Sequence, residues 1–310
     1  MVKNNRTLGF AESFVLSGTA AAISKTSAAP IERVKLLLQN QNELIKQQKL
    51  GSKFSGVQDC ILKTLRNEGI TSFWRGNFAS VLRYFPQQAL NFTFKDQIKA
   101  IFKISNTATN KEKFARNIIS GGCAGCLSLL FVQSMDYTRT RLAMDAAKNS
   151  DKRMRQFNGI IDCYVKTLNA DGIRGLYRGF MISCTCIFVY RGLYFGLYDS
   201  LKPILLGMGN DIPWFHTFLL GWAVTIVSGL TAYPIDTVKR KMMMTSGEKV
   251  KYSGSIDCFR HILKNEGGPK ALFNGCGVNV ARGVAGAGVL SGFDKFTNVY
   301  HGWRLQNNTK

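Results

Sequence analysis

Residues 30–35 read PIERVK, residues 134–139 read SMDYTR and residues 234–239 read PIDTVK. The strings begin 104 and then 100 residues apart, and each places an acid at its third position and a basic residue at its sixth. Two of them open with proline, which frees a backbone carbonyl and bends a helix. Since residues three apart share one helix face, the strings predict three equivalent helices, each with a charged pair near its end.

Three further series recur in the same order. Strings with aromatic-x-Gly followed by Asp-Cys begin at residues 54, 157 and 252, and strings from an acid-Gly pair to a final Gly begin at residues 68, 171 and 266. An acid follows an aromatic-rich apolar stretch at Asp96, Asp199 and Asp294. Four series in one register predict a threefold repeat of about one hundred residues. We expect repeats at 8–104, 112–206 and 210–300, joined in one transmembrane domain.

Each repeat contains two long helical segments around a shorter one. The first segments fall near 8–39, 113–144 and 211–243, and the second near 77–100, 178–202 and 275–299. All reach the ~20 residues that cross a bilayer, and small residues four apart, such as Gly121 and Gly125, are typical of packed membrane helices. We predict an all-α membrane protein with six transmembrane helices in three tandem repeats, pseudo-threefold symmetry and short amphipathic helices. A soluble helical solenoid is the alternative, because the mean hydropathy is only −0.03.

The charge indicates an anionic partner. Lys and Arg number 41 against 19 Asp and Glu, which gives a net charge of +22. Nucleic acid, an anionic lipid surface and a phosphorylated metabolite would all fit. A nucleic-acid-binding helical protein would carry its basic residues on a solvent face, whereas Lys25, Arg83 and Arg282 lie inside apolar segments. Charge there is costly, so these residues are expected to face a water-filled centre, and nucleic acid is not an expected partner.

Enzyme chemistry is not indicated. The chain has no G-x-x-x-x-G-K-[ST] loop, and its three histidines are too scattered to suggest a catalytic constellation. Eight cysteines without further ligands at metal-binding spacing predict reduced intracellular thiols and no metal site.

The repeated strings resemble the mitochondrial carrier family from about residue 10 to residue 300. Longer strings, among them ISKTSAAPIERVKLLLQNQ, LRYFPQQALNFTFKD and YPIDTVKRKMMM, are similar to the members that exchange ADP for ATP. The resemblance implies an electrogenic ADP/ATP antiporter, a multi-pass protein of the mitochondrial inner membrane. It would work as a monomer by alternating access to a single central site. No cofactor is implied, and cardiolipin is the implied structural lipid. Another carrier, for a different nucleotide or phosphorylated anion, is the alternative within the family.

The resemblance also implies a substrate site and a signature. The phosphate ligands would be Lys25, Arg83 and Arg282, and the adenine pocket would hold Tyr190, Ile187, Cys186 and Ala232. Cys186 and Ala232 stand where the family pattern has glycine and serine. The signature would be Lys239, Arg240, Lys241, Met242, Met243 and Met244, with lysine in place of arginine at two positions. Lysine keeps the charge but loses the planar fork that holds phosphate.

Two gates follow from the same resemblance. The matrix gate would pair Glu32 with Arg139, Asp136 with Lys239 and Asp236 with Lys35, and Gln39 would brace it; pairing within each helix is the alternative. The cytoplasmic gate would contain Asp96, Lys99, Asp199, Lys202 and Asp294. Its third pair is incomplete, because Thr297 stands where the pattern places a basic residue.

The glycines of the recurring signatures are the implied lipid-binding residues. They are Gly56, Gly76, Gly159, Gly179, Gly254 and Gly275. Each falls near the expected start of a helix, where free N–H groups can bind phosphate. Gly76 and Gly179 each follow an arginine, whereas Gly275 follows Asn274, so the third repeat departs from the pattern.

Overall fold

A computed structural model describes residues 10–101, 110–145, 155–206, 214–248 and 252–283, and these residues form helices and connections without any strand. The long helices are α1 (Phe10–Lys46), α3 (Asn77–Ile101), α4 (Asn110–Met144), α6 (Phe180–Leu206) and α7 (Trp214–Met244), and residues 276–283 are also helical. The short ones are α2 (Val57–Glu68), the 3-10 helix η1 (Ile70–Trp74), α5 (Ile160–Leu176), α8 (Ser255–Asn265) and α9 (Pro269–Leu272). The order of long, short and long elements thus occurs in the first two repeats, and the described part of the third repeat has a long helix followed by short ones and the helical residues 276–283.

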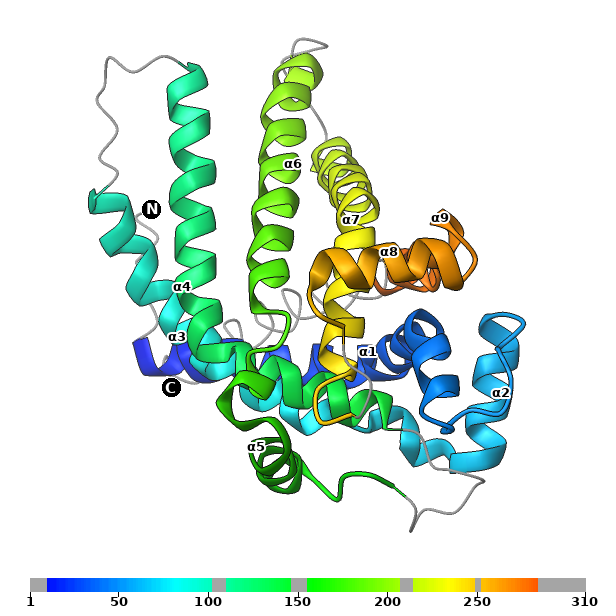
Figure 1. The fold of residues 1–310 in the computed structure, drawn as a ribbon. Helices are drawn as coiled ribbons and strands as arrows, with labels where there is room; N and C mark the ends of the chain where they lie inside the picture. The colour runs from blue at the N-terminus through cyan, green and yellow to red at the C-terminus, as the bar shows by residue number, and fades with distance from the viewer. Residues whose placement is uncertain (1–9, 102–109, 146–154, 207–213, 249–251, 284–310) are drawn as a thin grey trace, which may run out of the picture.

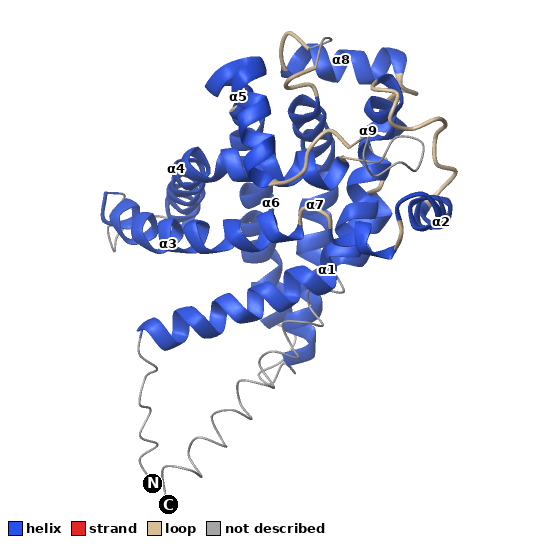
Figure 2. Cartoon of the chain, turned by 90° about the horizontal axis from the view of Figure 1, so that it is seen from below, coloured by secondary structure: helices blue, strands red, loops and turns tan. Residues whose placement is uncertain are grey.

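The long helices pack mainly against their neighbours in the chain. α3 packs on α4, α6 packs on both α4 and α7, and α1 contacts α3, α4 and α7. In Figure 1 the upper parts of α4, α6 and α7 run side by side, while α1 lies across their lower ends. Seen from below, α2, α5 and α8 are spread around the rim of the molecule (Figure 2). We call the end of the molecule that carries α2, α5 and α8 the short-helix end.

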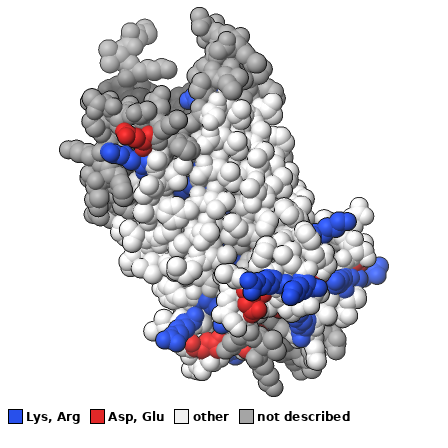
Figure 3. Space-filling view, turned by 45° about the horizontal axis from the view of Figure 1, so that its top comes forward, with Lys and Arg blue, Asp and Glu red and all other residues white. Residues whose placement is uncertain are grey.

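Three of the described helices are long and apolar enough to cross a membrane: Ile118–Met144, Phe180–Lys202 and Leu219–Met244. Exposed apolar side chains line them, among them Phe131 on α4, Met181 on α6 and Val227 on α7. On the face drawn in Figure 3, charged side chains gather mainly at one end, below a wide uncharged surface. Such a surface suits hydrocarbon rather than water.

The recurring aromatic-x-Gly-x-x-Asp-Cys string builds the start of each short helix. In the first repeat Phe54 is buried, Asp59 accepts a hydrogen bond from the backbone N–H of Ser55 at 2.9 Å, and Cys60 is fully buried. Asp162 and Asp257 accept equivalent bonds at 2.9 and 3.0 Å. Cys163 and Cys258 are likewise fully buried, and burial raises the pKa of the Cys60 thiol to about 11. The aromatic, acidic and cysteine residues of the string therefore shape the start of each short helix.

The last glycine of the aromatic-basic-Gly signature lets neighbouring repeats approach closely. Gly76 adopts a φ of +81°, and a Cβ placed there would lie 3.1 Å from the carbonyl oxygen of Arg139. Gly275 has a φ of +80° and faces the carbonyl oxygen of Lys35 at 3.1 Å in the same way. A Cβ placed at Gly179 would lie 3.5 Å from the carbonyl oxygen of Lys239. Each repeat thus meets the next repeat's first long helix at the same position, and the third meets the first.

We predict that Gly76→Ala lowers the free energy of unfolding by about 1–2 kcal/mol or more, because the left-handed backbone alone costs that much for an L residue. The added methyl group would also crowd the backbone of α4. Thermal unfolding of the detergent-solubilised protein measures the effect. Gly51→Ala is the matched control, since nothing lies within 4 Å of a Cβ at that position and its backbone is not left-handed. Equal stability of the two variants would contradict the close-approach account.

Candidate functional site

Three ion pairs join α1, α4 and α7 into a closed ring near the short-helix end. Lys35 Nζ lies 3.1 Å from Asp236 Oδ2, and Lys239 Nζ lies 2.8 Å from Asp136 Oδ2. Arg139 pairs with Glu32 through Nη2 and Oε1. These are the pairs between helices that the family resemblance implied, and each joins one repeat to another. The alternative, pairs three residues apart within each helix, is not what the ion pairs of these six residues show, although Arg240 contacts Asp236 one turn back on α7 at 3.4 Å.

The ring has polar support from both sides. Gln39 donates its side-chain N–H groups to Asp236 at 3.3 Å and to Thr237 at 2.9 Å, which places it against one pair of the ring. Arg240 Nη1 lies 3.7 Å from Asp136 and also donates to Thr140. Arg83 of α3 approaches the same carboxylate at 3.6 Å. Asp136, almost fully buried, therefore receives cations from α3 and α7.

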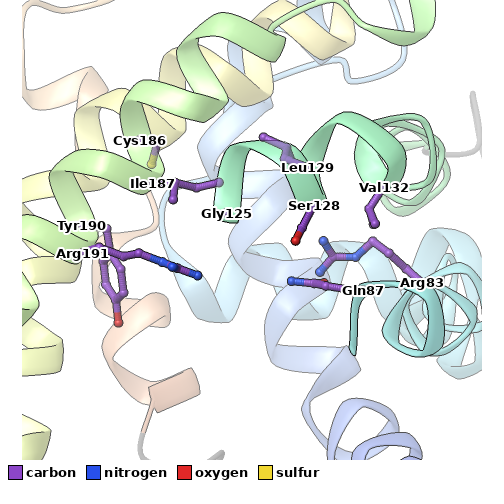
Figure 4. Close-up of a pocket in the computed structure, with 10 residues that line it drawn as sticks. All are labelled: Arg83, Gln87, Gly125, Ser128, Leu129, Val132, Cys186, Ile187, Tyr190 and Arg191. Carbon is purple, nitrogen blue, oxygen red and sulfur yellow. The ribbon is translucent and has the colours of Figure 1, made fainter. Parts of the chain in front are cut away.

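A cavity of about 240 Å³ lies between α3, α4 and α6. Its lining residues are Arg83, Gln87, Gly125, Ser128, Leu129, Val132, Cys186, Ile187, Tyr190 and Arg191. In Figure 4 Arg83 and Gln87 reach into this space from one side, and Tyr190 and Arg191 face it from the other. Four of the predicted substrate residues, Arg83, Cys186, Ile187 and Tyr190, are thus brought together. The polar lining residues Gln87, Ser128 and Arg191 were not predicted.

The other predicted substrate residues are not part of this lining. Lys25 Nζ lies 5.8 Å from the centre of the Tyr84 ring. Ala232 is buried within α7, and Arg282 is exposed in the segment 276–283. Tyr190, Tyr194 and Tyr198 form a stacked ladder along α6, with ring centres 6.3 and 6.1 Å apart. Arg83 and the tyrosine ladder together give the site a cationic part and an aromatic part.

The predicted cytoplasmic gate lies mostly outside the described part of the chain. This applies to the side chains of Asp96, Lys99 and Asp199, and to Asp294 with all of residues 284–310. Lys202 is described and lies 5.6 Å from the centre of the Tyr198 ring. The pairing of these residues remains a prediction.

The six signature residues divide between charge pairing and packing. Lys239 and Arg240 contact the ring, whereas Lys241 is fully buried and binds Glu266 at the short-helix end. The three methionines enter three different apolar clusters. Met242 packs with residues of the third repeat, Met243 with those of the second and Met244 with those of the first. Flexible thioether side chains suit such irregular junctions.

An arginine strut at two repeat junctions was missed by the sequence analysis. Arg75 Nη2 lies 2.6 Å from Asp145 Oδ2 and donates to the backbone carbonyl of Phe157 at 2.5 Å. Arg178 donates to Thr245 at 3.2 Å and to the carbonyl of Tyr252 at 2.6 Å, which is the equivalent pair of contacts one repeat later. The aromatic-basic-Gly signature marks these arginines, but their side-chain acceptors, Asp145 and Thr245, differ in type. At the third junction Asn274 replaces the arginine.

The third junction is held by a different polar cluster. Lys46, at the end of α1, lies 3.0 Å from Glu43 and 3.0 Å from Glu266. Asn42 donates to Glu266 at 2.9 Å, and the Lys241 ammonium binds the same carboxylate. Burial alone would raise the pKa of Glu266, but the charge of Lys241 and these hydrogen bonds lower it to about 2. The cluster requires α1 to continue to Lys46, beyond the predicted end at residue 39; no glycine or proline interrupts residues 31–50.

The predicted lipid-binding glycines fall into two groups. Gly56, Gly159 and Gly254 precede α2, α5 and α8 in extended conformations, and nothing lies within 4 Å of a Cβ at any of them. Gly76, Gly179 and Gly275 instead face the backbone of a neighbouring repeat. The first group leaves free space at the N-termini of α2, α5 and α8. The second group packs against the backbone of another repeat.

The chain matches the model of the mitochondrial carrier protein family three times, over residues 6–106, 110–209 and 210–302. It belongs to the mitochondrial carrier family, which confirms the predicted all-helical membrane fold with three repeats. A protein of Kluyveromyces lactis named ADP,ATP carrier protein is 55% identical over 302 residues, covering 97% of this chain and 99% of the relative. ADP,ATP carrier protein 3 of Saccharomyces cerevisiae is 55% identical over 96% of each chain. The mitochondrial ADP,ATP carrier protein 1 of Gossypium hirsutum is 56% identical over 94% of this chain and 76% of the relative.

We predict that Asp145→Ala lowers the free energy of unfolding by about 3–5 kcal/mol, since it leaves the Arg75 charge without its partner. The Asp145 side chain is fully buried and also accepts backbone N–H bonds from Gln156 and Phe157, each at 3.1 Å. Chemical or thermal unfolding in detergent measures the loss. Asp59→Ala is the comparison variant. That carboxylate is partly exposed, pairs with Lys63 on its own helix and accepts one backbone N–H from Ser55, so its loss should cost less. A loss no larger than the control's would remove the strut from our account.

Proposed function

We propose that this protein exchanges ADP for ATP across the mitochondrial inner membrane through a single central site. The observation that supports it best is the position of Arg83, which lines the cavity and also lies 3.6 Å from the Asp136 carboxylate of the ring. A phosphate that binds Arg83 competes with Asp136 for the same guanidinium. Substrate binding and the strength of the ring are therefore linked through one side chain.

The cavity chemistry fits a nucleotide. Arginine offers a forked, charge-assisted contact to phosphate, and Lys25 and Arg282 are proposed as further phosphate ligands once the substrate has entered. Tyr190 and the ladder above it offer an aromatic surface to a base, beside Ile187 and Cys186. A base-stacking surface favours a nucleotide over inorganic phosphate, which would use only the cationic part.

Transport follows from alternating closure at two ends. We place the short-helix end toward the matrix, so the ring of Lys35, Arg139 and Lys239 with their acids is the closed matrix gate. Asp96 and Lys99, with Asp199, Lys202 and Asp294, form the opposite gate. Bound nucleotide offsets the loss of the ring pairs, which lets the equilibrium shift toward the matrix-open state. If ATP carries one more negative charge than ADP, the membrane potential contributes ~2.3 kcal/mol per 100 mV to the exchange.

The lipid and the assembly state complete the proposal. The open helix N-termini at Gly56, Gly159 and Gly254 fit the phosphate groups of cardiolipin. The three repeats, at 8–104, 112–206 and 210–300, form one transmembrane domain. All contacts of the ring lie within one chain, which is consistent with a functional monomer.

Exchange in proteoliposomes tests the function and its alternative. Liposomes loaded with ADP should take up labelled ADP and ATP, and a membrane potential should bias the exchange toward one direction. GTP and inorganic phosphate should exchange much more slowly. Preferential exchange of phosphate or of another nucleotide would replace the proposal by another carrier function of the same family.

We predict that Arg83→Ala weakens nucleotide binding by roughly ten- to a hundredfold, since a hydrogen bond to a charged group is worth about 1.5–3 kcal/mol. Exchange kinetics and nucleotide-dependent thermal shifts both report the change. The matched control is Lys63→Ala, which removes an exposed cation from α2, far along the chain from the cavity lining. Wild-type affinity in Arg83→Ala would exclude this arginine from the site.

A further inference from the structure

Two thiols outside the proposed nucleotide site come together where α4 packs on α6. The contacts of two glycines define the register of this packing. Gly122 faces the ring of Phe188, and a Cβ at Gly125 would lie 2.9 Å from Cγ2 of Ile187. One turn onward from Gly122 the chain reaches Cys126, and one turn back from Phe188 it reaches Cys184. Because the helices run in opposite directions, these two cysteines occupy facing positions.

The side chains agree with this register. Cys126 and Cys184 lie within interaction range of each other, and both thiols are free. Facing positions on two packed helices are the arrangement from which a disulfide can form. No group of three or more His, Cys, Asp or Glu that could hold a metal occurs in the described ranges, so the pair favours covalent closure over metal binding.

The thiol pair lies toward the apolar exterior. Ile119 and Leu130 stand seven residues before and four residues after Cys126, on the same helix face, and they are 45% and 42% exposed. Met181, one turn before Cys184, is 75% exposed. In a membrane-spanning segment such exposed apolar side chains contact lipid. Reagents dissolved in the bilayer can therefore reach this pair, whereas Cys60, Cys163 and Cys258 are fully buried.

We propose that Cys126 and Cys184 form an intramembrane disulfide when they react with a lipid hydroperoxide. The sulfur of Cys184 attacks the outer oxygen of the hydroperoxide, the O–O bond breaks, and the lipid leaves as an alcohol. The resulting sulfenic acid reacts with the Cys126 sulfur, which forms the S–S bond and releases water. The two thiols are oxidised, the peroxide is reduced, and the two thiol protons end in the alcohol and the water.

The bridge would fix one wall of the cavity. Gly125 and Ile187 both line the cavity, and they lie next to Cys126 and three residues after Cys184. A covalent link here holds α4 and α6 at their present separation, in the state whose ring is closed. Any transport step that moves these helices against each other is then blocked. This consequence rests on the proposed transport function, whereas formation of the bridge does not.

The experiment treats the full chain in liposomes that contain a phosphatidylcholine hydroperoxide, with unoxidised phosphatidylcholine as the comparison. Peptide mapping by mass spectrometry detects the bridge directly, as a linked peptide pair lighter by two hydrogens than the separate thiol peptides. Nucleotide exchange is measured on the same liposomes before and after a thiol reductant. Cys126→Ala and Cys184→Ala remove the pair, and Cys123→Ala is the control one turn away on α4.

The expected result is a peptide linked through Cys126 and Cys184 in the wild type and in Cys123→Ala, with exchange lost and then restored by the reductant. Neither Cys126→Ala nor Cys184→Ala should show the link or the reversible loss. Absence of the link, or a link from Cys184 to Cys123, would overturn the proposed site. A link with unchanged exchange would overturn the blocking role alone. Absence of exchange in untreated protein would count against the proposed function, and the linked peptide would still decide the disulfide.

Discussion

The buried carboxylate of Asp136 imposes the constraint on which the rest of the structure depends. A charge in such a place is tolerated only when opposite charges and hydrogen bonds surround it. Lys239, Arg240 and Arg83 meet this requirement from two other long helices, at 2.8, 3.7 and 3.6 Å. The repeats must therefore come together around this carboxylate. The signature glycines allow it, because each brings one repeat against the backbone of the helix that supplies a ring residue.

Much of the fold and part of the site could be predicted from the sequence. The recurrence of PIERVK, SMDYTR and PIDTVK fixed the repeat, and the structure places their acids and bases in pairs between helices. The positions of these acids and bases could be predicted because each string has an acid and a basic residue at the same spacing. The gating role of these pairs, by contrast, stays a prediction, as does the whole cytoplasmic network.

The struts at the junctions could not be predicted, for two physical reasons. Arg75 and Arg178 bind backbone carbonyls, which leave no trace in residue identity. Their side-chain acceptors are Asp145 and Thr245, which lie six residues after a ring base but differ in type. The third junction is harder still to predict, because its contacts differ in kind from those of the other two. There Asn274 removes the strut, and a cluster around Glu266 holds the junction instead. The three equivalent junctions thus have the same close approach between repeats but are held by different interactions.

The central claim is that the ring pairs are energetically coupled across repeats. A double-mutant cycle on Lys35 and Asp236, followed by thermal unfolding in detergent, tests it most directly. The two side chains approach within 3.1 Å and come from the first and third repeats. The account predicts that Lys35→Ala and Asp236→Ala together cost less than the sum of the single losses, with a coupling of about 0.5–3 kcal/mol. Strictly additive losses would show that the pair does not hold the repeats together, and the account of a closed ring would fail.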